Sequence, residues 1–159
     1  MSRRKISKKR VIESDLIYEN ELMQLIINRL MRKGNKSLAQ KILYKSVKQI
    51  ATTTNQDPIK IIEQAILNIT PFVEIKPRRV GGSTNQIPVY INNSRGTSLA
   101  IKWLFQSSNN KSNPKSSIVD RLSLEIINAA NGIGDAIKKR DELHKIAEAN
   151  KTISKYNVI

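Results

Sequence analysis

Guanidinium groups beside a pair of glycines are the most chemically informative feature of this chain. Arg78 and Arg79 carry planar, permanently charged groups that match phosphate oxygens two at a time. Gly81 and Gly82 follow closely, and glycine can take the positive φ that a chain reversal requires while leaving its backbone N–H uncovered. Residues 76–89 therefore predict a β-hairpin whose tip contacts phosphate.

The stretches on either side of this tip have the alternation of strands. Residues 72–76 are aromatic and β-branched with a period of two, and residues 87–91 repeat that character. Pro88 has no N–H to give to a β-ladder, so its strand is expected at an edge or projecting freely. The hairpin is accordingly expected at about 72–91.

Enzymatic chemistry has few candidates in this chain. The single histidine, His144, lies in a basic segment, where a structural or RNA-contacting role is favoured over catalysis. Asp141, Glu142 and Glu148 lie about one turn from lysines, which predicts ion pairs within a helix. Without cysteine there is no thiolate for a metal site or a nucleophile. We expect no catalytic residue, no metal, no cofactor and no small-molecule substrate.

Composition indicates a folded protein with a polyanionic partner. The chain has 159 residues, of which 39% are hydrophobic, and its 28 Lys and Arg against 13 Asp and Glu give a net charge of +15. This length suits one domain. No apolar run approaches the roughly 18 residues of a membrane span, and the charged start lacks a secretory pattern. We expect no membrane partner and an intracellular or organellar location.

Basic residues gather in four separate places. Residues 1–12 have many cations and no acid, which predicts a flexible tail that a polyanion would neutralise; a tail serving only solubility is the alternative. The other clusters are the turn with Arg32, Lys33 and Lys36, the hairpin with Arg95 and Lys102, and the last helix. A basic surface spread over four places suits a folded RNA, which has several phosphate ridges, better than one straight duplex. Residues 13–159 are expected to form a single helical RNA-binding domain.

Three helices are expected before the hairpin, because apolar residues recur there every three or four positions. The first covers about 21–34, and the second covers 37–53 with Leu38 among its inward residues. Asp57 and Pro58 start the third, since an acceptor side chain before a proline is a typical helix beginning.

Three further helices are expected after it. A Thr-Ser pair at 97–98 can cap the fourth, which buries Trp103, and the polar stretch 106–117 is expected to be an exposed loop. Ser117 can cap the fifth, and the sixth covers about 135–151. The predicted fold class is therefore mainly α, a bundle of about six helices with a protruding β-hairpin between the third and fourth.

With these residues identified, the chain resembles the family of the seventh protein of the small ribosomal subunit, in its bacterial and plastid form. The match is carried by Arg-Arg-Val-Gly-Gly-Ser-Thr at 78–84 and Leu-Ala-Ile-Lys-Trp-Leu at 99–104. It continues through Ala-Ile-Lys-Lys-Arg at 136–140 and Ala-Glu-Ala-Asn-Lys at 147–151, and covers essentially the whole chain. The segment 14–18 is more similar to the plastid branch.

The resemblance implies a structural constituent of the ribosome and no catalysis. Members of the family bind the 3′ domain of small-subunit rRNA, nucleate assembly of the head, and lie near the exit-site tRNA and the mRNA exit path. The implied partners are rRNA, that tRNA and mRNA, and neighbouring ribosomal proteins. The implied location is the small ribosomal subunit of the plastid (chloroplast) stroma, with the bacterial cytoplasm as the alternative.

The resemblance also assigns site residues. Those expected to bind RNA are Arg3, Arg4, Lys5, Lys8, Lys9, Arg10, Lys36, Lys76, Arg78, Arg79, Gly81, Gly82, Ser83, Thr84, Arg95 and Lys102. Those expected on the side of the exit-site tRNA are Val80, Asn85, Gln86, Lys138, Lys139 and Arg140. The loop 107–117 and the ending 152–159 depart from the family and receive no role.

Two other classes compete with this interpretation: a helical DNA-binding architectural protein and a small RNA-modifying enzyme. DNA readers usually place a helix in the major groove, whereas arginine is concentrated here on a hairpin. Sedimentation with small subunits would separate the classes.

Overall fold

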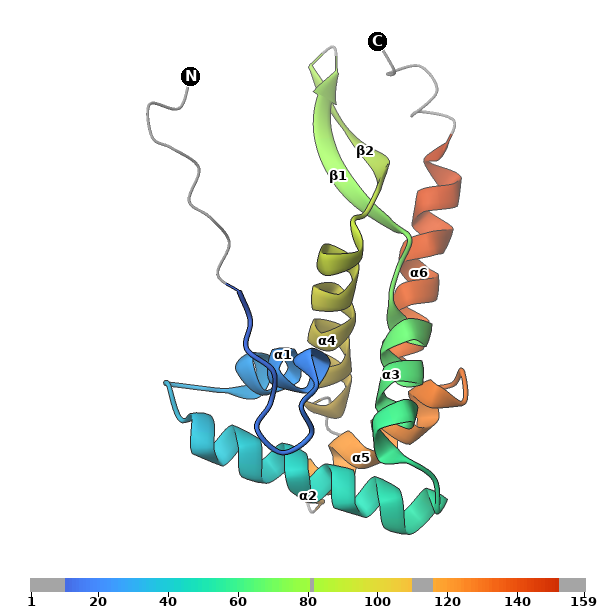
Figure 1. The fold of residues 1–159 in the computed structure, drawn as a ribbon. Helices are drawn as coiled ribbons and strands as arrows, with labels where there is room; N and C mark the ends of the chain where they lie inside the picture. The colour runs from blue at the N-terminus through green and yellow to red at the C-terminus, as the bar shows by residue number, and fades with distance from the viewer. Residues whose placement is uncertain (1–10, 81, 110–115, 152–159) are drawn as a thin grey trace, which may run out of the picture.

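A computed structural model describes residues 11–80, 82–109 and 116–151, with the side chains of Val80 and Ser83 left aside. Within these ranges the chain forms six helices and one two-stranded antiparallel sheet, inserted between the third and fourth helices (Figure 1). This is the predicted fold class. The elements are α1 (Glu21–Leu30), α2 (Lys36–Thr54), α3 (Pro58–Ile69), β1 (Val73–Val80), β2 (Ser83–Tyr90), α4 (Asn93–Asn109), α5 (Ile118–Ala130) and α6 (Asp135–Ala149).

Two helix beginnings follow the sequence signals closely. Asp57 accepts a hydrogen bond from the backbone N–H of Ile59 at 3.1 Å, and Pro58 is the first residue of α3. Ser117 accepts from the N–H of Val119 at 3.0 Å, while Asp120 accepts from the N–H of Ser117 at 3.2 Å. This reciprocal pair is a capping box, so the start of α5 is fixed locally.

The core lies around α5, which packs against α2, α3 and α4. The apolar stripe predicted for α3 is buried throughout, because helical spacing turns all of its members toward the other helices. Trp103 is half-buried and packs against this core, which agrees in part with its predicted burial. The largest fully buried side chains are Met23, Ile26, Ile27, Leu43, Val47, Ile50, Ile62, Ile69, Ile101, Leu104, Leu122 and Ile126.

The predicted beginning and the predicted end of α4 are both wrong. The helix begins at Asn93, and Thr97 lies within it, donating from Oγ1 to the backbone oxygen of Asn93 at 2.9 Å. It also continues to Asn109 through residues expected to be loop, with Ser107 and Ser108 buried. Ser108 donates to the backbone oxygen of Phe105 at 3.0 Å, so its hydroxyl is satisfied inside the helix. The rest of the predicted loop, 110–115, lies outside the described residues.

Leu38 is a second correction. It was predicted to face inward, but its side chain is 55% exposed near the start of α2, whereas Ala39 and Leu43 are buried. Helical periodicity alone cannot tell whether the first turn of a helix is covered by a neighbour.

The hairpin projects beyond the start of α4 and lies beside the end of α6 (Figure 1). Its register pairs Val73 with Tyr90 at the base and Val80 with Ser83 at the tip. Gly82 has φ +87°, as predicted for the reversal, and Gly81 lies outside the described residues. A sheet of two strands has only edges, so the position predicted for Pro88 is confirmed.

Candidate nucleic-acid interface

The strand register places the two hairpin arginines on opposite faces. Arg78 lies opposite Asn85 and Arg79 lies opposite Thr84, and successive side chains of a strand point to opposite sides of a sheet. Both arginines are exposed. The two guanidinium groups therefore cannot hold one phosphate from the same side; each face of the hairpin carries its own cation.

Lys76 and Arg78 share one of these faces, and Glu74 lies on the same face nearer the base. Arg95 of α4 donates from Nη2 to Oε1 of Glu74 at 2.7 Å, which joins the start of α4 to β1. This hydrogen bond from the Arg95 guanidinium holds the pKa of the Glu74 carboxyl below its usual range. The Arg95 side chain remains 58% exposed, so its other donors still face solvent.

Lys102 extends this face along α4. It lies about two helical turns beyond Arg95, and both residues are exposed. We call Lys76, Arg78, Arg95 and Lys102 the basic strip. Four of the residues that sequence assigned to RNA thus lie on two elements that an ion pair joins, and Glu74, the acid on the same face of β1, is already paired with Arg95.

The other predicted RNA-binding residues lie elsewhere. Lys36 is exposed at the start of α2, and the turn before this helix lies well away from the hairpin (Figure 1). Thr84 is exposed near the hairpin tip, and the backbone of Ser83 belongs to β2. The tail residues Arg3, Arg4, Lys5, Lys8, Lys9 and Arg10 lie outside the described residues, as does Gly81.

Two cations of α6, Lys138 and Arg140, have partners within the protein. Lys138 donates to Asp135 at 3.0 Å, and this hydrogen bond raises the pKa of Lys138. Arg140 donates from Nε and Nη2 to Oδ1 of Asp141, at 2.9 and 2.7 Å. Asp141, one of the acids expected to form an ion pair within this helix, pairs with Arg140, and Asp135 pairs with Lys138.

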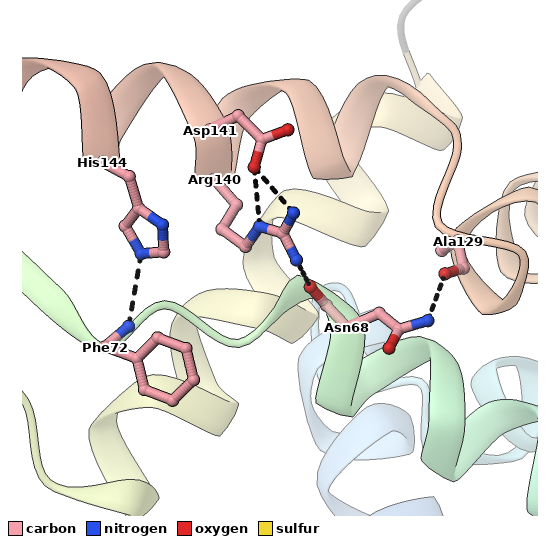
Figure 2. Close-up of polar contacts among 6 residues, drawn as sticks. All are labelled: Asn68, Phe72, Ala129, Arg140, Asp141 and His144. Atoms are coloured by element: carbon pink, nitrogen blue, oxygen red, sulfur yellow. Dashed lines mark hydrogen bonds and ion pairs between the residues drawn. The ribbon is translucent and has the colours of Figure 1, made fainter.

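Arg140 also joins α6 to α3. Its Nη1 donates to the backbone oxygen of Asn68, and the Arg140 side chain is only 27% exposed (Figure 2). The amide nitrogen of Asn68 in turn donates to the backbone oxygens of Ala129 and Ala130, at 3.0 and 2.9 Å. Asn68 thereby satisfies carbonyl groups at the end of α5, which the helix itself leaves unpaired. Sequence reasoning missed Asn68, because nothing in the local pattern shows which distant groups its amide reaches.

His144 joins α6 to the base of the hairpin through a hydrogen bond and a ring contact. Its Nε2 accepts a hydrogen bond from the backbone N–H of Phe72 at 3.4 Å, and the two rings are stacked with centroids 6.1 Å apart (Figure 2). Only the neutral imidazole offers a ring nitrogen as acceptor, so this contact requires an unprotonated Nε2. The structural role favoured for His144 over catalysis agrees with this geometry.

Other kinds of site find little support in the described ranges. Histidine and carboxylate side chains there form no cluster that could hold a metal ion. A search of the same residues finds no helix that is long and apolar enough to cross a membrane.

A comparison with protein families identifies the chain. The model of the family "Ribosomal protein S7p/S5e" matches residues 2–151. The chain belongs to this family. Membership of the ribosomal protein S7p/S5e family confirms the resemblance seen in the sequence, and it replaces the enzyme and DNA-binding alternatives with a structural protein of the ribosome.

Curated relatives within the ribosomal protein S7p/S5e family match over their full length. The chain is 67% identical over 159 residues to the small ribosomal subunit protein uS7c of Bigelowiella natans, and the match covers 100% of both chains. It is 47% identical over 156 residues to the protein of the same name from Ostreococcus tauri, covering 98% of this chain and 99% of the relative. Small ribosomal subunit protein uS7 of Gloeothece citriformis (strain PCC 7424) is also 47% identical over 156 residues, with the same coverage.

Proposed function

We propose that this chain is a structural protein of the plastid small ribosomal subunit that binds the 3′ domain of the subunit's rRNA and thereby nucleates assembly of the head. The observation that carries the RNA contact is the basic strip, because its four cations continue from the hairpin onto α4. Relatives designated uS7c support the plastid stroma as the location. Neighbouring ribosomal proteins are further partners in such a subunit.

The ion pair between Arg95 and Glu74 supports RNA binding mainly because it positions the cations of the basic strip, and less because it stabilises the fold. Exposed ion pairs contribute little to stability, about 0 to 1 kcal/mol. The pair nevertheless joins the base of β1 to the start of α4, so it restricts how far Lys76 and Arg78 can move relative to Arg95. Cations held in a fixed order lose less conformational entropy when phosphates bind to them. The tail cations at 3–10 are proposed to neutralise further phosphates.

The opposite side of the hairpin is the proposed side of the exit-site tRNA and the mRNA exit path. Val73, Pro88 and Tyr90 line a hollow of about 290 Å³ with His144 and Ala147 of α6, so this face of the hairpin turns toward α6 at its base. The register places Arg79, Thr84 and Gln86 on the same face.

The register also separates residues that the resemblance grouped together. Asn85 lies on the face of Arg78, away from Gln86. Lys138 and Lys139 remain proposed contacts on the tRNA side. For Arg140 we propose a positioning role, because its guanidinium is bonded to Asn68 and Asp141.

The RNA contact can be tested by measuring the affinity of the full chain for a transcript of the 3′ domain at several salt concentrations. Substituting Lys76→Gln, Arg78→Gln and Lys102→Gln together should weaken binding and reduce the logarithmic salt slope by about 0.7 to 0.9 per lost phosphate contact. The matched control is Lys41→Gln, Lys45→Gln and Lys48→Gln, which removes exposed cations of α2 outside the strip. Equal losses in both triple variants would show that the strip has no special part in binding.

Assembly needs a second measurement. Wild-type chain added to protein-free small-subunit rRNA should protect the 3′ domain from nucleases and allow later head proteins to join. Failure of later proteins to join despite normal protection would separate RNA binding from nucleation and would refute the latter.

A further inference from the structure

A groove of about 360 Å³ lies between the turn that joins α1 to α2 and the facing parts of α4 and α5. Its floor is apolar and comes from all four helices: Leu30, Leu38, Ile42, Phe105 and Ile118. Leu38, the residue wrongly predicted to face inward, is 55% exposed because it lines this hollow. Single exposed leucines are ordinary, but here several apolar side chains share one concave surface of a size that holds small ligands.

The rim of the groove is cationic. Arg29 lies in the last turn of α1, and Arg32 and Lys33 lie in the turn that follows. All three are exposed, and in the part of the chain that the structure describes none of them forms an ion pair. No carboxylate occurs among the described residues that line the groove. By contrast, the hollow between α5 and α6 is lined by three carboxylates, those of Asp120, Glu125 and Asp135, as well as by two cations, so it suits a phosphate less well.

The turn holds these cations in place. Lys33 has φ +51° and Gly34 has φ +79°, and the N–H of Asn35 donates to the backbone oxygen of Arg32 at 3.1 Å. A lysine rarely adopts the left-handed conformation, and such strain is retained where the surrounding structure demands it. The side chain of Asn35 makes no capping hydrogen bond to α2, and together with Asn109 it brings amide groups to the groove.

We propose that this groove receives a single unstacked nucleotide of the bound RNA, with the base on the apolar floor and the flanking phosphates at Arg29, Arg32 and Lys33. The inference rests on the RNA-binding function proposed above and names a further contact for it. An unpaired base presents a flat apolar face suited to Leu38 and Phe105, and a polar edge suited to the amides of Asn35 and Asn109. A purely apolar peptide would use the floor but leave three cations without anions.

The test compares Leu38→Gln with Leu38→Met in the full chain, using a transcript of the 3′ domain as the probe. Leu38→Gln should weaken binding about 5- to 150-fold, the range expected for losing one base contact, and should leave the salt slope unchanged because no charge is removed. Leu38→Met keeps the apolar floor and should bind like the wild type. Arg32→Gln should reduce the salt slope by about 0.7 to 0.9.

Controls separate this inference from the function on which it rests. Leu67→Gln, at a leucine that is 69% exposed on α3, should not change RNA affinity. A perfectly paired RNA duplex should bind Leu38→Gln and the wild type equally. If the wild type fails to bind the transcript, the proposed function is refuted and this inference with it. Two results would refute only the nucleotide site. One is that Leu38→Gln binds the transcript as tightly as the wild type does. The other is that the substitution weakens binding to the paired duplex as strongly as binding to the transcript.

A second measurement does not depend on how the variants fold. A photoreactive side chain introduced at position 38 should cross-link to one unpaired rRNA nucleotide in assembled small subunits. Cross-links to another ribosomal protein would show that a protein segment occupies the groove, and would overturn the proposal.

Discussion

Phe72 and His144 lie 72 positions apart in the sequence, yet the backbone N–H of Phe72 donates to Nε2 of His144 and their rings stack. This contact joins the residue just before β1 to the middle of α6. A second link, from Arg140 to Asn68, joins the same helix to the end of α3 (Figure 2). Together they hold the helix on the proposed tRNA side against the end of α3 and the base of the hairpin.

We therefore expect Arg140 to contribute mainly to the stability of the fold and less to the binding of RNA. Replacing it by Lys keeps the charge but loses the forked contact with Asp141 and the bond to Asn68, which should lower the free energy of unfolding by about 1 to 3 kcal/mol. Denaturant unfolding measures this difference, with Lys139→Arg as the control on the same helix. A variant that unfolds like the wild type but retains less exit-site tRNA would show that Arg140 is a direct contact.

Stability should depend on pH through Glu74. The folded-state pKa of this carboxyl lies below its ordinary value of 4.5, so its pair with Arg95 stabilises the fold fully above about pH 4.5. That contribution is lost as the pH falls through the lower folded-state pKa. Glu74→Gln should thus be slightly less stable than the wild type at pH 7, and this difference should shrink as the pH falls below 4.5 and through the folded-state pKa. Glu13→Gln is the control, because Glu13 is an exposed acid that forms no ion pair with any residue in the described ranges. A pH-independent difference would contradict the prediction.

Trp103→Ala should destabilise the fold without a separate effect on RNA. Full burial of the ring would imply a loss of about 3 to 5 kcal/mol, but the side chain is half-buried, so we expect roughly 2 to 3 kcal/mol. Thermal unfolding gives the loss, and RNA affinity is measured well below the melting temperature. Normal stability combined with lost affinity would identify the ring as a binding surface.

The hairpin should separate assembly from decoding. Joining Pro77 to Gln86 through Asn-Gly keeps that cross-strand pair in register while removing 78–85, and should leave the helical body intact. Subunits with this variant should release deacylated tRNA faster and make more reading-frame errors, but they should also bind rRNA less tightly, because Arg78 is lost from the basic strip. A variant with only 80–83 replaced keeps both arginines, so it should show the tRNA defect in a milder form while head assembly stays normal. If head assembly fails while tRNA retention stays normal, the hairpin acts in assembly and not in decoding, and the prediction is wrong.

Local signals in the sequence were sufficient wherever one segment fixes its own conformation. The caps at Asp57 and Ser117, the stripe of α3 and the glycine turn of the hairpin all depend on neighbouring residues, and all were predicted. The ends of α4 and the exposure of Leu38 depend instead on which helices pack nearby.

The same division applies to the candidate site. Its residue types could be predicted, since arginine, lysine and glycine near a turn indicate phosphate binding. The contacts that each cation makes within the protein could not be predicted, because Glu74 lies 21 positions from Arg95 and Asn68 lies 72 positions from Arg140. Proximity of this kind arises only when the helices pack.

The two prolines of the hairpin have a consequence for the protein before it meets its RNA. A two-stranded ribbon exposes both outer edges, and such edges invite strands from other copies to pair with them. Pro77 in β1 and Pro88 in β2 interrupt these edges, and Lys76, Arg78 and Arg79 add mutual repulsion between copies. The newly made, unassembled chain is thereby protected against aggregation by the same hairpin that is proposed to enter the ribosome.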